Sequence, residues 1–322
     1  DLMARLVPDY FDESEMAVFT GGADVGVAFS KLAFDHLIFT GATSVGKHIM
    51  RAAADNLVPV TLELGGKSPT FIGRSANKDL VGQRVALGKM MNAGQICLAP
   101  DYLLVAEDQE GEVIDSVSKG VASLYPTLLK NDDYTSVVNG RNFDRLQGYL
   151  ADAREKGAEV IEVNPANEDF ASANGHKMPL HIVRGATDDM KVMQEEIFGP
   201  ILPVKTYKTI DEAIDYVNAH DRPLGLYYFG QDKSEEDRVL TRTISGGVTV
   251  NDVLFHNAME DLPFGGVGPS GMGNYHGLDG FRTFSHARAV YRQPKLDVAG
   301  LAGFKPPYGK ATAKTLAKEL KK

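Results

Sequence analysis

Short runs of apolar, β-branched residues alternate along this chain with segments that carry apolar residues at helical spacing, and this alternation constrains the fold most strongly. The run 35–40 leads into Gly41, and the segment 43–54 that follows has helix-forming character. Strands that alternate with helices are typical of an open, mostly parallel sheet. The sequence therefore predicts an α/β fold.

The same alternation continues further along the chain. We expect strands at 58–64, 103–106 and 160–163, and helices at 75–91, 141–156 and 209–220. The helix over 141–156 is amphipathic, with Phe143, Leu146, Tyr149 and Leu150 on one face. These segments predict a second αβ region after the first strand–helix unit.

Composition limits the class of protein. A length of 322 residues suits one large or two ordinary domains, and 43% hydrophobic with 24% charged residues is ordinary for a globular enzyme. The net charge of −9 argues against nucleic acid or an anionic membrane as the main partner. A single cysteine excludes an internal disulfide and fits a reducing compartment. No apolar run approaches the ~20 residues that cross a bilayer. We expect a soluble, cytoplasmic protein with no nucleic-acid and no membrane partner.

The C-terminal stretch 305–322 differs from the rest of the chain. It is rich in lysine and helix-forming residues but has few apolar anchors, and Pro306-Pro307 precedes it as a break. We expect a frayed, solvated tail.

Cys97 is a candidate nucleophile, because a thiol can attack a carbonyl carbon. A lone cysteine is more often a small buried apolar residue, so the residue type alone decides nothing. Gly94 and Pro100 bracket Cys97, which favours a loop, and loops on rigid scaffolds often carry the chemistry.

Glu63 is a candidate general base, thirty-four residues upstream of the thiol. It stands at the end of a predicted strand, before Gly65-Gly66, and could be no more than a surface charge. Leu62 and Leu64 flank it, however, and a partly apolar setting raises the pKa of a carboxyl group toward the useful range for a base.

The turn 41–46 between a predicted strand and a predicted helix can present backbone N–H groups to a phosphate. Gly41 and Gly46 lack the Cβ atoms that would hold a pyrophosphate away. Such a turn also occurs where a strand simply connects to a helix without any ligand, so the turn alone does not establish a phosphate site.

Five stretches, in this order, resemble the aldehyde dehydrogenase superfamily. They are 39–46, 61–69, 91–100, 195–200 and 262–286. The last and longest is similar to the class three branch, and most like the coniferyl aldehyde dehydrogenases within it. The resemblance runs from the first residue to about Tyr291.

This resemblance implies an aldehyde dehydrogenase-like fold, with an incomplete Rossmann-type cofactor domain and an αβ catalytic domain with an open, mostly parallel sheet. The implied domains are the remaining part of the cofactor domain (1–65), the catalytic domain (66–250), a return segment with an oligomerisation strand (251–291) and a C-terminal tail (292–322). The family's Pro-Trp-Asn and Lys-Pro-Ser segments have no counterpart here, so we expect an N-terminally truncated chain. A homodimer or higher homo-oligomer is expected.

The resemblance also implies a reaction with NAD or NADP as cofactor. Cys97 would attack an aldehyde to give a thiohemiacetal, which passes hydride to nicotinamide, and water activated by Glu63 would hydrolyse the thioester. The implied cofactor residues are Thr40, Gly41, Gly46, Leu64 through its backbone, Glu196 at the nicotinamide ribose and Phe198 near the ring; Phe264 would line a substrate tunnel.

Each of these side chains also has a plainer interpretation, as a surface acid or a packing aromatic residue. The implied substrate is an aromatic or long aliphatic aldehyde, such as coniferyl aldehyde. No histidine spacing indicates a metal site. Two alternatives stand beside the dehydrogenase: an inactive fragment that acts only as an assembly partner, and an enzyme that acylates coenzyme A. Glu63 argues against the second, because acylating relatives generally lack that base.

Overall fold

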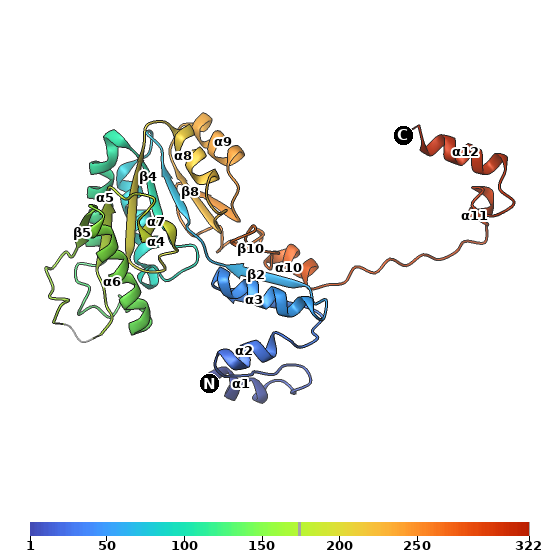
Figure 1. Cartoon of the computed structure of the whole chain (residues 1–322), viewed down its shortest axis with the longest axis horizontal. Coiled ribbons are helices and arrows are strands. Elements are labelled where there is room, and N and C mark those ends of the chain that lie inside the picture. Colours follow the sequence, from blue (N-terminus) through green and yellow to red (C-terminus); the bar gives the residue numbers. More distant parts are fainter. Residues whose placement is uncertain (173–174, 322) are drawn as a thin grey trace. The chain divides into compact units, whose positions relative to one another are not determined.

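Two β-sheets organise the larger of the two compact units into which the chain divides. This computed structural model describes residues 1–172 and 175–321, and its units are Asp1–Phe284 and Ser285–Lys322. Figure 1 shows the strands and helices of each unit.

The large sheet has seven strands in the order β5-β6-β7-β4-β3-β8-β9. All neighbours are parallel except β5 and β6, which are antiparallel at one edge. This confirms the predicted open, mostly parallel sheet. Its strands are β3 (Pro69–Ile72), β4 (Tyr102–Ala106), β5 (Glu159–Val163), β6 (Leu180–Arg184), β7 (Ile201–Tyr207), β8 (Gly225–Phe229) and β9 (Gly247–Val250).

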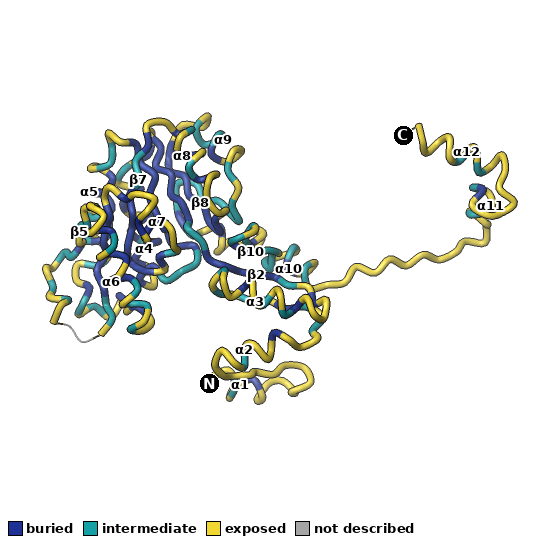
Figure 2. Tube along the Cα trace, viewed as in Figure 1, coloured by how far each residue is buried: buried dark blue, intermediate teal, exposed yellow. Residues whose placement is uncertain are grey.

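Helices cover both faces of this sheet, so its central strands are buried on both sides (Figure 2). Because side chains alternate along a strand, Leu103 and Val105 of β4 join one core cluster and Leu104 and Ala106 join the other. The helices over the first face are α4 (Lys78–Met90) and α5 (Glu110–Leu124). Those over the second are α6 (Gly140–Glu155), α7 (Lys191–Gln194), α8 (Ile210–Asn218) and α9 (Lys233–Arg242). The predicted helices at 75–91, 141–156 and 209–220 are confirmed.

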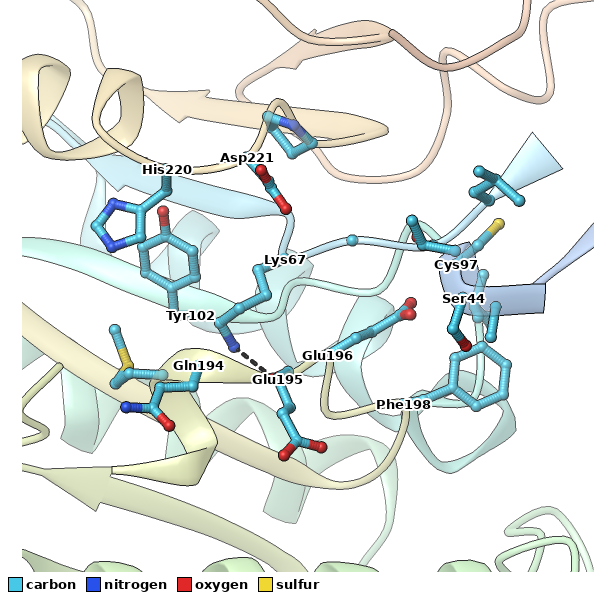
Figure 3. A pocket seen from close by; sticks show the side chains of 18 of the residues that line it. Ser44, Lys67, Cys97, Tyr102, Gln194, Glu195, Glu196, Phe198, His220 and Asp221 are labelled. Carbon is cyan, nitrogen blue, oxygen red and sulfur yellow. Dashed lines mark hydrogen bonds between the residues drawn. The ribbon is translucent and has the colours of Figure 1, made fainter. Parts of the chain in front are cut away.

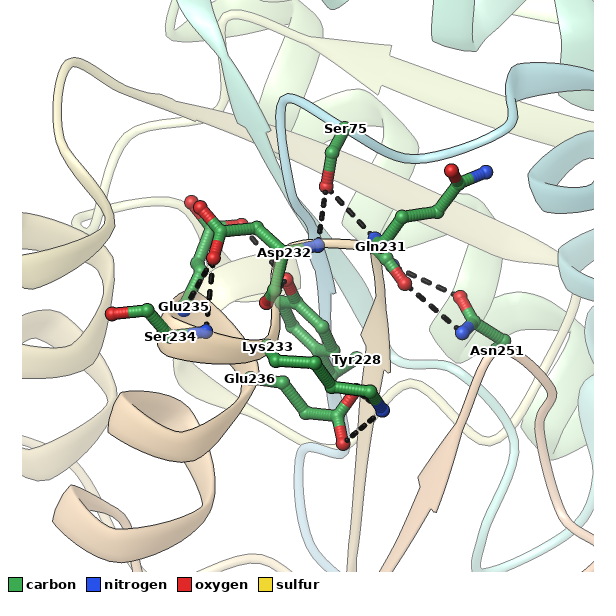
Figure 4. Close-up of polar contacts among 10 residues, drawn as sticks. Ser75, Tyr228, Gln231, Asp232, Lys233, Ser234, Glu235, Glu236 and Asn251 are labelled. Atoms are coloured by element: carbon green, nitrogen blue, oxygen red, sulfur yellow. Dashed lines mark hydrogen bonds and ion pairs between the residues drawn. The ribbon is translucent and has the colours of Figure 1, made fainter.

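A polar network fixes the chain where β8 gives way to α9 (Figure 4). Asp232 caps α9 by accepting from the N–H groups of the first turn. The Ser75 hydroxyl oxygen accepts from the N–H groups of Gln231 and Asp232, at 2.8 and 3.1 Å. Asn251 exchanges two hydrogen bonds with the backbone of Gly230, at 2.9 and 3.0 Å. The ends of β3, β8 and β9 are thereby held together.

The small sheet has three strands in the order β1-β2-β10. β1 (Leu37–Gly41) is parallel to β2 (Val60–Leu64), and β10 (Gly271–Met272) is antiparallel to β2. The helix α3 (Thr43–Ala54) connects the parallel pair, which confirms the predicted strand, glycine turn and helix.

The larger unit also contains several short helices and 3-10 turns. They are α1 (Leu2–Leu6), η1 (Val7–Asp9), α2 (Ala23–Phe29), the 3-10 turns η2 (Met91–Gly94) and η3 (Glu107–Gln109), and α10 (Gly277–Thr283). Among the described residues, no helix is long and apolar enough to cross a membrane.

The smaller unit contains α11 (Val298–Leu301) and α12 (Lys310–Glu319). Hydroxyl groups of Thr312 and Thr315 donate to the carbonyl oxygens of Gly303 and Ala302 and so tie the two helices together. α12 has no buried residue, as the predicted solvated tail requires; Lys322 lies outside the described residues. Residues 285–291 form no strand in this single chain. The oligomerisation strand would need the sheet of a second subunit as its partner, so it stays a prediction. The domain division of the sequence analysis also stays a prediction.

Candidate functional site

A cavity of about 1270 Å³ lies where the small sheet, the Cys97 loop and the segment after α7 meet (Figure 3). It brings together most of the side chains singled out from the sequence. Lining residues from that set are Thr40, Gly41, Glu63, Leu64, Cys97, Glu196 and Phe198. Gly46 and Phe264 do not line it.

The loop that carries Cys97 begins with three successive residues at positive φ: Asn92 at 50°, Ala93 at 52° and Gly94 at 72°. A Cβ atom on Gly94 would lie 2.5 Å from the carbonyl oxygen of Gly199, so only glycine fits. The Gln95 side chain then ties the loop down by donating to two carbonyl groups and accepting from a backbone N–H. The predicted loop with a glycine bend is confirmed.

Cys97 is half-buried, and its thiol is held in the protonated form. Burial, followed by the negative charges of Glu63 and Glu196, raises the pKa of Cys97 to about 11. The N–H groups of Cys97 and Leu98 act in the opposite direction. The resting thiol therefore needs a base to become a nucleophile.

Glu63 lies at the end of β2, between Thr40 of β1 and Gly271 of β10. Its side chain is 3% exposed, and Oε1 has no hydrogen-bond partner in the part of the chain that the structure describes. Burial raises the pKa of Glu63 to about 7, which confirms the predicted apolar setting. A carboxyl group of this kind can both take up and release a proton near neutral pH.

Glu196 supplies a second carboxyl group to the cavity. Burial, followed by the charge of Asp101, raises the pKa of Glu196 to about 7, while a bond from the Gly66 N–H opposes this rise. A Cβ atom on Gly65 would lie 2.0 Å from Glu196 Oε2. The carboxyl group thus lies directly against the glycine turn that follows Glu63.

Phe198 reaches the cavity from a backbone conformation that phenylalanine rarely adopts. Its φ is 47°, and its side chain is 39% exposed. Arg145 fixes the peptide before it by donating to the carbonyl oxygens of Ile197, at 2.8 Å, and Glu196, at 3.3 Å.

Gly46 and Phe264 lie behind the cavity rather than in its wall. The room beside Gly46 is filled by Leu64, whose Cδ2 would lie 2.6 Å from an added Cβ atom, so this glycine serves the packing of α3 on β2. Phe264 is 4% exposed, stacks on His276 and meets the Tyr275 ring edge-on, and its cluster also contacts Cys97. Their roles toward cofactor and substrate stay predictions.

Sequence reasoning missed a set of charged residues in and behind the cavity wall, of which Lys67 lines the cavity. Lys67 forms an ion pair with Asp101, and Lys89 is 1% exposed with its pKa lowered to about 8 by burial. The sequence did offer an indication for Lys67 and Asp101. Lys67 follows Glu63 by four positions, and Asp101 follows Cys97 by four. Among the residues that are described, no group of His, Cys, Asp or Glu side chains could hold a metal ion.

Comparison with known proteins gives matches over most of the chain. The sequence model described as "Aldehyde dehydrogenase family" matches residues 2–290. A probable coniferyl aldehyde dehydrogenase of Caulobacter vibrioides is 60% identical over 322 residues, which are all of this chain and 66% of that protein. A coniferyl aldehyde dehydrogenase of a Pseudomonas species is 56% identical over 96% of this chain and 64% of its own length.

Solved structures agree with these matches. The structure of Staphylococcus aureus AldH in a substrate-bound state superposes with a TM-score of 0.89 at 36% identity. The match covers 99% of this chain and 68% of that one. The chain thus spans about two thirds of the length of these relatives.

Proposed function

Because the chain belongs to the aldehyde dehydrogenase family, we propose that Cys97 is the nucleophile of a nicotinamide-dependent oxidation of an aldehyde to the carboxylic acid. The observation that carries this proposal is the placement of Glu63. A buried carboxyl group with an unpartnered oxygen atom, among the described residues, lines the same cavity as the chain's single thiol. Because the chain covers 66% and 64% of two relatives, the proposal concerns the site that it contributes to the whole protein.

The residues around the cavity suit a dinucleotide. Thr40 and Gly41 line it at the turn before α3, where a helix begins and an anion is favoured. The Glu196 carboxylate can accept hydrogen bonds from ribose hydroxyl groups, and Phe198 offers an aromatic face. We assign NAD or NADP to this region, with the backbone of Leu64 beside it. When bound, the nicotinamide accepts the hydride from the aldehyde carbon.

The chain's own residues perform the remaining steps. The Cys97 thiol gives its proton to a carboxylate in the cavity, and Sγ bonds to the aldehyde carbon while the N–H groups of Cys97 and Leu98 hold the developing oxyanion. After oxidation the carbon is a thioester. Water then attacks it as Glu63 takes the water proton, the C–S bond breaks, and the carboxylic acid leaves.

An aromatic aldehyde such as coniferyl aldehyde is the proposed substrate class. Two coniferyl aldehyde dehydrogenases are among the relatives with the highest identities given above. The rings of Phe264, Tyr275 and His276 pack together, with centroids 4.8 to 5.6 Å apart, and the cluster around Phe264 reaches Cys97. An aromatic cluster of this kind behind the nucleophile favours a planar, apolar substrate.

The test is an assay of the full-length protein with coniferyl aldehyde and either NAD or NADP. We expect reduced nicotinamide and the free acid to form together, and Cys97→Ser to abolish both. Acid formation that survives complete alkylation of Cys97 by iodoacetamide would overturn the assignment. Product that forms only when coenzyme A is supplied would replace hydrolysis by acyl transfer. Failure of both NAD and NADP to bind in a calorimetric titration would favour the non-catalytic assembly partner.

A further inference from the structure

The ion pair between Lys67 and Asp101 joins the two segments that carry the proposed catalytic residues. Lys67 follows Glu63 by four positions, and Asp101 follows Cys97 by four. The two side chains are 18% and 4% exposed. The pair therefore links the turn after β2 to the end of the Cys97 loop, at the wall of the cavity that Lys67 lines.

The same two side chains also hold a third segment, residues 192–198. The ammonium group of Lys67 donates to the carbonyl oxygens of Val192, at 2.7 Å, and Glu195, at 3.0 Å. The other oxygen of Asp101 accepts from the N–H of Ile197, at 3.0 Å. Figure 3 shows the bond from Lys67 to Glu195 beside Glu196. All three N–H donors of Lys67 and both carboxylate oxygens of Asp101 are thus in use.

These bonds grip the backbone on both sides of Glu196. Its neighbours Glu195 and Ile197 are bonded to Lys67 and Asp101, respectively, so the peptide that carries Glu196 has little freedom to turn. Phe198 follows with a φ of 47°. A conformation of this kind is unfavourable for phenylalanine and persists only where the surroundings enforce it.

We propose that Lys67 and Asp101 are positioning residues, which together set the place of Glu196 and Phe198 relative to Cys97. The proposal rests on the proposed function in that Glu196 and Phe198 are its cofactor residues. Asp101 does not line the cavity, whereas Lys67 forms part of its wall with its three N–H donors turned to Asp101 and the 192–195 backbone. Its charges also act on Glu196, because the Asp101 charge raises the pKa of that carboxyl group and the Lys67 charge lowers it.

A plainer account treats the pair as a structural ion pair without effect on the site. The two accounts differ in what happens when both charges are removed together. A buried ion pair adds little stability over apolar side chains of similar volume, whereas removal of one partner leaves a buried charge and destabilises strongly. The double variant Lys67→Met with Asp101→Leu should therefore fold, yet it lacks the bonds that Lys67 makes to Val192 and Glu195 and the bond of the Ile197 N–H to Asp101.

The experiment compares hydrogen exchange, Cys97 alkylation and kinetics in the full-length protein. We expect amide exchange at residues 195–198 to rise at least about tenfold in the double variant, because the Ile197 N–H loses its acceptor and the Val192 and Glu195 carbonyl groups lose their donor, which favours local opening. We also expect the KM for NAD or NADP to rise about tenfold or more, with less change in the KM for the aldehyde. Because Cys97 is the only cysteine, the rate of its alkylation can be measured with and without NAD or NADP. The slowing of alkylation by the bound cofactor reports on the position of the cofactor site relative to Cys97 without any turnover.

Lys156→Met is the matched control. Lys156 also pairs with a carboxylate, Asp152 at 2.9 Å, and donates to a carbonyl oxygen, that of Asp189 at 2.5 Å, but these residues do not line the cavity. It should leave exchange at 195–198 and cofactor protection of Cys97 unchanged.

A folded double variant with wild-type exchange at 195–198 and wild-type cofactor protection would overturn the positioning role. If the double variant does not fold, Lys67→Met with Asp101→Asn removes both charges with side chains of similar shape; it is judged by exchange at residue 195 and by cofactor protection, because Asn at position 101 can still accept from the Ile197 N–H. Absence of dehydrogenase activity in the wild-type protein would count against the proposed function alone, because hydrogen exchange still tests the positioning.

Discussion

The thiol of Cys97 should react slowly near neutral pH and gain reactivity far into the alkaline range. Burial and two nearby carboxylates raise the pKa of Cys97 from an ordinary value of 9.0 to about 11. Since one pKa unit is tenfold in ionisation, the thiolate at pH 8 is about a hundredfold scarcer than for an unperturbed cysteine. A more basic thiolate is also more nucleophilic, by about six- to tenfold for two units. We therefore expect alkylation about tenfold slower than in the unfolded chain.

Iodoacetamide labelling followed by intact mass measures this rate directly, because the chain has one cysteine and the label is a single mass step. The rate should rise about tenfold per pH unit from pH 7 to about pH 10, whereas the rate in denaturant should level off near pH 9. Glu63→Gln and Glu196→Gln should each move the folded profile to lower pH, since each removes a negative charge that disfavours the thiolate. A folded profile that levels off at or below pH 9 would refute this account of the site.

Four further predictions concern neighbouring groups. Glu63→Gln should let an acyl thioester accumulate on Cys97 in quenched-flow mass spectrometry; hydride transfer slowed to the same extent, with no adduct, would show another role for Glu63. The same variant should raise the melting temperature at pH 8 but not at pH 4. The pKa of Glu63 rises from 4.5 in the unfolded chain to about 7 in the folded protein, so folding disfavours the ionised carboxylate. This destabilisation is complete above pH 7 and absent below pH 4.5. Gly65→Ala should weaken NAD or NADP binding in calorimetric titration, because the added Cβ atom would lie 2.0 Å from Glu196 Oε2 and displace that carboxyl group. Unchanged affinity would show that Glu196 does not bind the cofactor. Tyr227→Phe should cost about 1–3 kcal/mol in denaturant unfolding, because the Leu98 carbonyl loses its buried 2.6 Å bond from the Tyr227 hydroxyl; a loss below about 0.5 kcal/mol would mean that water replaces the hydroxyl group.

The sequence predicted those parts of the structure that depend on local pattern. The helix at 43–54 and the strand ending at Glu63 follow from short-range periodicity and glycine placement, and both are confirmed. The apolar setting of Glu63 could also be predicted, because its two leucine neighbours lie in the same buried strand. The motifs further indicated which segments belong to one site.

What the sequence did not predict depends on side chains brought together from distant segments. The bond of Lys67 to Asp101 spans thirty-four positions and its bonds to 192–195 span more than a hundred, so no local pattern announces them. The neighbour of Gly46 is a leucine from another strand, which is why a glycine expected to make room for a ligand makes room for Leu64 instead. The positive φ of Phe198 likewise results from contacts outside its own segment.

The two cavity carboxyl groups have a consequence for the heat of binding. Glu63 and Glu196 both have a pKa raised to about 7, so each is near half ionisation in a neutral buffer. A polyanion that enters the cavity disfavours their charged forms and therefore draws protons from solution. The measured binding enthalpy should consequently vary with the ionisation enthalpy of the buffer. Titrations in phosphate and in Tris at the same pH should give enthalpies that differ by the number of protons taken up multiplied by the difference between the two buffer ionisation enthalpies. Ligand binding to the cavity is thus coupled to the uptake of protons by its two carboxyl groups.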